Sequence, residues 1–210
     1  MTLVSSSVGA DEAPRAILAP VQLSDRPESW KTSAVYLAGL GKALRAAGLL
    51  ERVAPRLSVA TRKVIDNPYG ERWHSASHSA ELCTIVLEQF GPQALEDVAF
   101  VVSRDSFGPI LGPMLKVALT LSGVSPATVF GRINQSLMPV VQGVSATWRS
   151  DTARSGFVTF EYPMVAPPFT EVTWRGGLRF MFLLVGLEGT IAPCERLEGG
   201  RMLRFPVSWK

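Results

Sequence analysis

Residues 144–162 read VSATWRSDTARSGFVTFEY, and residues 174–209 read WRGGLRFMFLLVGLEGTIAPCERLEGGRMLRFPVSW. In the first stretch apolar and polar residues alternate on both sides of a polar connection, which is typical of two strands joined as a hairpin. The segment from Trp174 to Gly186 is apolar almost all round and predicts a buried helix. Residues 190–194 and 202–209 flank a Glu-Gly-Gly turn, so the order predicted for residues 144–210 is β-β-α-β-β, an antiparallel sheet.

The chain before this sheet has helical periodicity. Apolar residues recur at helical spacing from residue 29 onward, with Gly48 as a C-terminal cap. Asn67-Pro68 and Gly91-Pro92 indicate points where helices end. Residues 1–28 carry prolines and isolated charges without a sustained period, and we expect a flexible tail. The sequence therefore predicts an α+β fold, in which an N-terminal helical bundle packs on a small antiparallel sheet. Residues 29–210 would form a single domain, helical over 29–143 and sheet-containing over 144–210.

Composition limits the classes of function. The 210 residues are 47% hydrophobic and 19% charged, which suits a folded core rather than disorder. Apolar runs fall short of the ~18–20 residues of a membrane span, and the N-terminus lacks the pattern of an export signal. Two isolated cysteines fit a reducing compartment, so a cytoplasmic location is expected. The 21 basic and 18 acidic residues are interleaved, which argues against direct nucleic-acid binding.

The closing segment carries a resemblance. Gly176-Gly177-Leu178, Gly186, Cys194, Gly199-Gly200 and residues 205–209 (FPVSW) form a glycine-led helix, a cysteine-containing strand, a glycine turn and a Phe-x-Val strand. This pattern resembles the ligand-binding superfamily of heme-nitric-oxide-binding domains, 4-vinyl-reductase-like domains and transport-particle subunits. Residues 67–73 and the glycine-ended helices after them are also similar to an uncharacterised paralogous family of myxobacterial proteins. The resemblance implies a bacterial sensor, regulator or assembly subunit and transfers no catalytic residues.

Two histidines give the sharpest local signal. His74 and His78 are four residues apart, so both imidazoles would share one face if residues 73–79 were helical, and that face would suit a divalent metal. No third ligand is fixed by the sequence. Solvated or capping histidines are the alternative. In the heme branch of the superfamily a Tyr-x-Ser-x-Arg motif grips the propionates, and residues 149–154 (RSDTAR) lack it. The prediction is therefore no cofactor, with heme or a divalent metal as the alternative.

Aromatic and arginine side chains are the other candidates for a binding site. Trp73, Trp148 and Trp174 are predicted to line an apolar pocket between sheet and helices, although such residues are more often core. Arg149 and Arg154 would present guanidinium groups on the hairpin connection, with surface ion pairing as the alternative. These five residues are the predicted ligand-binding set.

The motifs of common enzymes are missing from the sequence, including GxSxG, HExxH, Walker and GxGxxG patterns. We therefore predict a non-catalytic regulatory, sensory or assembly module that binds a small apolar ligand or a protein partner and self-associates as a homodimer. The alternatives are a metal-dependent enzyme using His74 and His78, and the ligand-binding subunit of a transcription regulator.

Overall fold

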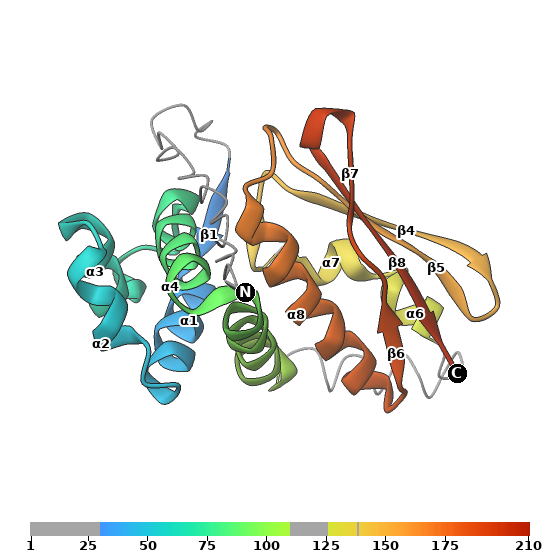
Figure 1. Ribbon diagram of the computed structural model, residues 1–210, viewed down its shortest axis with the longest axis horizontal. Helices are drawn as coiled ribbons and strands as arrows, with labels where there is room; N and C mark the ends of the chain where they lie inside the picture. Colours follow the sequence, from blue (N-terminus) through green and yellow to red (C-terminus); the bar gives the residue numbers. More distant parts are fainter. Residues whose placement is uncertain (1–29, 110–125, 138) are drawn as a thin grey trace, which may run out of the picture.

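The computed structural model describes residues 30–109, 126–137 and 139–210, and its helices and antiparallel sheets confirm the predicted α+β fold (Figure 1). The predicted tail, residues 1–28, lies outside the described residues. No helix in the described ranges is both long and apolar enough to cross a membrane.

Helices dominate the chain up to residue 137. They are α1 (Ala34–Ala46), α2 (Leu50–Val53), η2 (Ala54–Arg56), α3 (Val59–Asp66), η3 (Pro68–Gly70), α4 (Ala76–Val102), the π-helical η4 (Ser103–Phe107), α6 (Pro126–Phe130) and α7 (Ile133–Leu137). Serine side chains begin three of them: the side chains of Ser33, Ser58 and Ser75 accept hydrogen bonds from the backbone N–H groups of Tyr36, Thr61 and Ser77 at the starts of α1, α3 and α4. Helical geometry in α4 breaks at Gly91, whose φ of 81° precedes Pro92, in agreement with the helix end predicted there.

A small sheet, absent from the sequence prediction, ties the helical part together. Its strands are β1 (Lys31–Ser33), β2 (Trp73–Ser75) and β3 (Val141–Gln142), in the antiparallel order β2-β1-β3. Thr32 in the central strand is paired with His74 on one side and Val141 on the other. Residues far apart in the sequence thus meet at β1.

The C-terminal sheet follows the predicted order with one difference. Its strands are β4 (Ser145–Thr152), β5 (Ser155–Glu161), β6 (Gly189–Ile191), β7 (Glu195–Leu197) and β8 (Met202–Trp209), ordered β4-β5-β8-β6 with β7 also on β8. Of the single strand predicted over 190–194, only residues 190 and 191 are extended, in β6, and a further short strand, β7, begins at Glu195. Val158 and Phe160 of β5 lie opposite Phe205 and Leu203 of β8, and all four are fully buried. Burying each such side chain contributes about 1.5–3 kcal/mol.

Helix α8 (Pro168–Val185) lies between the helical part and this sheet (Figure 1). On the sheet side, Trp174 stacks on Phe160 with ring centroids 4.0 Å apart. On the other side, a Cβ at Gly176 would lie only 2.5 Å from the carbonyl oxygen of Glu96 in α4, so the two helices approach closely there. Arg179 also joins α8 to α4 through an ion pair with Glu96 at 3.0 Å. Gly186, with φ 66°, ends α8.

Candidate functional site

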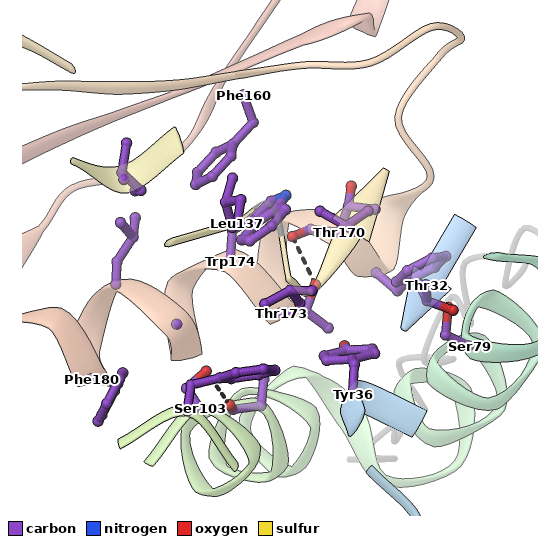
Figure 2. Close-up of a pocket in the computed structure, with 18 of the residues that line it drawn as sticks. Thr32, Tyr36, Ser79, Ser103, Leu137, Phe160, Thr170, Thr173, Trp174 and Phe180 are labelled. Carbon is purple, nitrogen blue, oxygen red and sulfur yellow. Dashed lines mark hydrogen bonds between the residues drawn. The ribbon is translucent and has the colours of Figure 1, made fainter. Parts of the chain in front are cut away.

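A cavity of about 120 Å³ lies between α8 and the helical part (Figure 2). Its walls come from both layers: β1, β3, α1, α4 and η4 belong to the helical part, and α8, β5 and α7, which packs on β4, belong to the side of the large sheet. The lining residues include Thr32, Tyr36, Ser79, Ser103, Phe160, Tyr162, Thr170, Thr173, Trp174 and Phe180. The cavity therefore sits where the layers of the fold meet.

The cavity wall is neutral and largely apolar. None of the described residues that line it is charged. The hydroxyls of three helical residues donate to carbonyl oxygens of their own helices: Ser79 to Ala76 at 3.0 Å, Ser103 to Ala99 at 2.9 Å, and Thr173 to Thr170 at 3.1 Å. Because these hydroxyls already have acceptors, they add little polarity to the cavity.

Tyr162 and Trp174 build the wall on the sheet side. The indole Nε1 of Trp174 donates to the Tyr162 hydroxyl at 2.6 Å. The rings of Trp30 and Tyr162 pack edge to face, with their centroids 5.7 Å apart. Burial raises the pKa of Tyr162 above its ordinary value, so the phenol stays protonated. With Trp174 stacked on Phe160, this wall is a set of aromatic side chains fixed by packing.

Tyr36 of α1 lines the helical side and interacts with Cys83 of α4. Burial raises the pKa of the Tyr36 hydroxyl well above its usual range, and it raises the pKa of the Cys83 thiol to about 12. Both groups are therefore neutral near pH 7. A thiol held in its protonated form is a poor nucleophile and a poor metal ligand.

Of the predicted ligand-binding residues, only Trp174 lines this cavity. Trp148 stacks on Phe130 at 5.1 Å, in a second aromatic cluster that also contains Trp209. Trp73 lies in β2, where it pairs with Ser33. Exposed Arg149 belongs to the outer part of β4, and exposed Arg154 lies in the turn between β4 and β5. A ligand-binding role for these four residues stays a prediction.

The histidines do not share one helix face. His74 lies in β2 and its Nε2 is 2.7 Å from the carbonyl oxygen of Pro68, whereas His78 lies in α4, which begins at Ala76. The condition for a shared face, a helix over residues 73–79, is therefore not met. Within residues 30–109, 126–137 and 139–210, no three His, Cys, Asp or Glu side chains gather in a metal-binding group. A metal role for His74 and His78 stays a prediction.

His78 belongs instead to a polar network that holds α3 against α4. Thr61 donates to Glu81, so Thr61 Oγ1 accepts from His78 Nδ1 at 2.9 Å, which makes Nδ1 the protonated ring nitrogen. Burial and the nearby charge of His74 lower the pKa of His78. Burial opposes ionisation of Glu81, yet hydrogen bonds from Thr61 and Ser58 outweigh it and lower that pKa. The network stabilises the α3 N-terminus.

Sequence reasoning missed Thr32, Tyr36 and Tyr162 as cavity residues. Tyr162 continues the alternating pattern of β5, which indicates that it faces the interior. Thr32 and Tyr36 are brought to the cavity by β1 and its turn into α1, and a three-residue strand leaves no readable period.

Comparison with known proteins finds relatives in structure only. No protein-family model matches the chain, and no curated protein matches it significantly. A point mutant of an H-NOX protein from K. algicida, in its Fe(II) unliganded state, is similar with a TM-score of 0.55 and 11% identity over 85% of this chain and 96% of that one. An oxygen-binding H-NOX domain related to soluble guanylate cyclases, in its oxygen complex, has a TM-score of 0.54 and 9% identity, covering 85% and 95%.

These comparisons overturn one prediction. A third similar structure, with a TM-score of 0.55 and 7% identity over 85% of this chain and 95% of that one, comes from work on heme distortion in the H-NOX family. The prediction of no cofactor is contradicted by this likeness, because the similar H-NOX structures include one from work on their heme. The likeness extends over most of both chains at low identity, and it establishes architecture rather than ligand. This chain has the fold of the H-NOX domains.

Proposed function

We propose that this protein is a non-catalytic sensory module that takes a small, neutral, largely apolar molecule into the cavity between α8 and the helical part. The observation that carries the proposal is the cavity itself, with an uncharged aromatic and aliphatic wall contributed by both layers. Buried pockets with apolar walls and few polar groups are the usual form of small-molecule sites.

The size of the cavity sets the size of the ligand. An apolar cavity of about 150 Å³ engineered into another protein stays dry and binds benzene or xenon. The cavity here, at about 120 Å³, is of the same order. The proposal is therefore a ligand of the size of a single aromatic ring.

Heme does not fit the residues that line this cavity. A porphyrin is several times larger than one aromatic ring, and its iron needs an axial ligand such as histidine or thiolate. The chain has two histidines, and neither His74 nor His78 lines the cavity. The described wall also offers no cation for the propionates, and Tyr36 and Cys83 are held in their neutral forms. The proposed ligand binding therefore does not involve heme.

The thiols support the non-catalytic part of the proposal. Burial raises the pKa of Cys83 to about 12 and that of Cys194 to about 11, so neither is an activated nucleophile near pH 7. We also propose membership of the myxobacterial family, a cytoplasmic location, self-association and a protein partner. A sensor also needs an effector that responds to its ligand-bound state.

Ligand binding would act on the contact between layers. The cavity is bounded by η4 and α4 on one side and by α8 on the other, and Gly176 brings α8 against α4 close by. A molecule that fills the cavity contacts both layers at once. It would thereby favour one relative position of α8, which is the physical requirement for a signal.

The test is a thermal-unfolding titration with toluene as the probe. The wild-type protein should gain melting temperature with rising toluene, because a ligand that binds only the native state stabilises it. Gly177→Leu places a side chain into the cavity and should abolish the gain. Leu183→Phe adds bulk on the exposed face of the same helix and is the matched control, with the gain retained.

A parallel titration with hemin, followed by its absorbance spectrum, separates the two ligand classes. Stoichiometric heme binding that Gly177→Leu prevents, without any response to toluene, would overturn the proposal. A toluene response lost only in Gly177→Leu would support it.

A further inference from the structure

Thr32 is the polar feature of the cavity that the proposed function leaves unexplained. Its side chain lines the cavity and the residue is only 5% exposed, yet its Oγ1 is buried without a hydrogen-bond partner among the described residues. A buried hydroxyl left unsatisfied costs stability, and native proteins rarely keep one without a reason.

The neighbouring hydroxyls do not share this condition. Ser79, Ser103 and Thr173 each donate to a carbonyl oxygen one turn back in their own helices. Thr32 lies in a strand, and a strand offers no such carbonyl. As the middle residue of the central strand β1, it pairs with β2 and β3 on its two sides, so its backbone is fixed in place. The free hydroxyl is therefore held by the fold at a defined position.

The polarity of the wall differs between the two ends of the cavity. Figure 2 shows Thr32 and Ser79 at one end of the view and Phe180 at the other, with Trp174 between them. The end near β1 thus carries the unpaired hydroxyl, and the opposite end is aromatic. A ligand that matches both ends has one polar group and an apolar body.

We propose that the cavity selects a small neutral molecule with one hydroxyl, of the phenol class, whose hydroxyl exchanges a hydrogen bond with Thr32 Oγ1 while its ring lies toward Phe180. This inference rests on the proposed function and names its ligand class. A neutral ligand is required because the described wall supplies no counter-charge, and a buried unpaired charge is far more costly than a buried hydroxyl.

The experiment is a thermodynamic cycle that combines two isosteric ligands with two isosteric protein variants. Phenol and toluene differ by a hydroxyl in place of a methyl group, and Thr32→Val makes the same exchange on the protein. Dissociation constants for both probes are measured by calorimetry on the wild type and on Thr32→Val. We expect the affinity ratio of phenol to toluene to fall by about tenfold in Thr32→Val, the effect of one hydrogen bond with both partners buried.

Two controls keep folding and binding apart. Without ligand, Thr32→Val should melt at a higher temperature than the wild type, because the variant removes an unsatisfied hydroxyl. Thr32→Ser keeps the hydroxyl and should keep the wild-type ratio. If Thr32→Val fails to fold, a crystal structure of the wild type with phenol decides, since the inference requires the phenol oxygen within hydrogen-bond distance of Thr32 Oγ1.

A failure of the Thr32 inference can be distinguished from a failure of the proposed function. If both probes bind and the ratio is the same in all three proteins, the Thr32 inference is overturned and the proposed function stands. If neither phenol nor toluene binds the wild type, the proposed function itself fails. A phenol oxygen placed away from Thr32 in the crystal would also overturn the inference.

Discussion

Two adjacent glycines of α8 should respond in opposite ways to the same substitution. At Gly177 an added Cβ would have Ser103 Oγ as its nearest neighbour at 3.7 Å, which is an ordinary contact. At Gly176 it would lie 2.5 Å from the carbonyl oxygen of Glu96 and 2.8 Å from the backbone nitrogen of Phe100. The first position has room for a methyl group, and the second faces the backbone of α4.

The magnitudes follow from these distances. Alanine is favoured over glycine inside a helix by about 1 kcal/mol, so Gly177→Ala should raise the free energy of unfolding by up to that amount. Gly176→Ala has the same helical gain, but it forces α8 away from α4, and overpacking of this kind costs about 1–3 kcal/mol or more. Because the helical gain is common to both, the two variants should differ by the overpacking cost of about 1–3 kcal/mol or more in the free energy of unfolding, with Gly176→Ala no more stable than the wild type.

Urea unfolding followed by far-ultraviolet circular dichroism measures this difference, and thermal melts give an independent value. For a chain of this size 1 kcal/mol corresponds to about 2–4 °C, so the melting temperatures should be separated by roughly 2–12 °C. Equal stability of Gly176→Ala and Gly177→Ala would refute the close approach of α8 and α4, and with it the placement of the cavity wall.

Three further predictions concern other parts of the structure. Gly156→Ala should destabilise the protein by about 2 kcal/mol or more and change its tryptophan fluorescence, because the added Cβ would lie 2.4 Å from the indole of Trp148. The pKa of His78 is lowered in the folded state, so the unfolded chain binds a proton at this residue more readily. The free energy of unfolding should therefore fall as the pH drops below 6.5. In urea titrations, His78→Asn should reduce this dependence of the unfolding free energy on pH. Cys83 and Cys194, with pKa values raised to about 12 and about 11, should react slowly with Ellman's reagent at pH 8 until denaturant is added, whereas reaction of Cys83 at the rate of free cysteine would contradict its burial.

The large sheet could be predicted from the sequence because its strands carry their own signal. Strands β5 and β8 each alternate between buried and more exposed positions over seven or eight residues, long enough for the period of two to be visible. The small sheet has strands of three, three and two residues. Such segments are strands only because their partners reach them, and a single sequence does not show long-range pairing.

Only one of the predicted ligand-binding residues lines the cavity, in part for the same reason. Trp148 and Trp174 are both apolar, bulky and near the sheet, and composition alone treats them as equivalent. The register of β4 places Trp148 against Phe130, whereas the helical phase of α8 places Trp174 against Phe160 and the cavity. Side-chain direction therefore decides which tryptophan lines the cavity.

The histidine spacing shows how one capping residue changes a site. Residues four apart share a face only inside a helix, and the side chain of Ser75 caps the helix that begins at Ala76. His74 falls before that cap, in β2, where its ring meets the Pro68 carbonyl. The serine-rich stretch was thus evidence for a helix start between the histidines rather than for one continuous metal-binding face.

The cavity itself follows from the glycine pair in α8. Gly176 lets the backbones of α8 and α4 touch, so the layers are pinned together at that point. One residue later Gly177 faces the cavity without a side chain, while the stacked rings of Trp174 and Phe160 fill the sheet side of the helix. Close contact at Gly176 and missing volume at Gly177 leave a space beside η4 that no neighbouring side chain fills. Because alanine at Gly177 is expected to stabilise the helix, a Gly177→Ala variant that is more stable but binds the probe less tightly would show that the space left by the glycine is used.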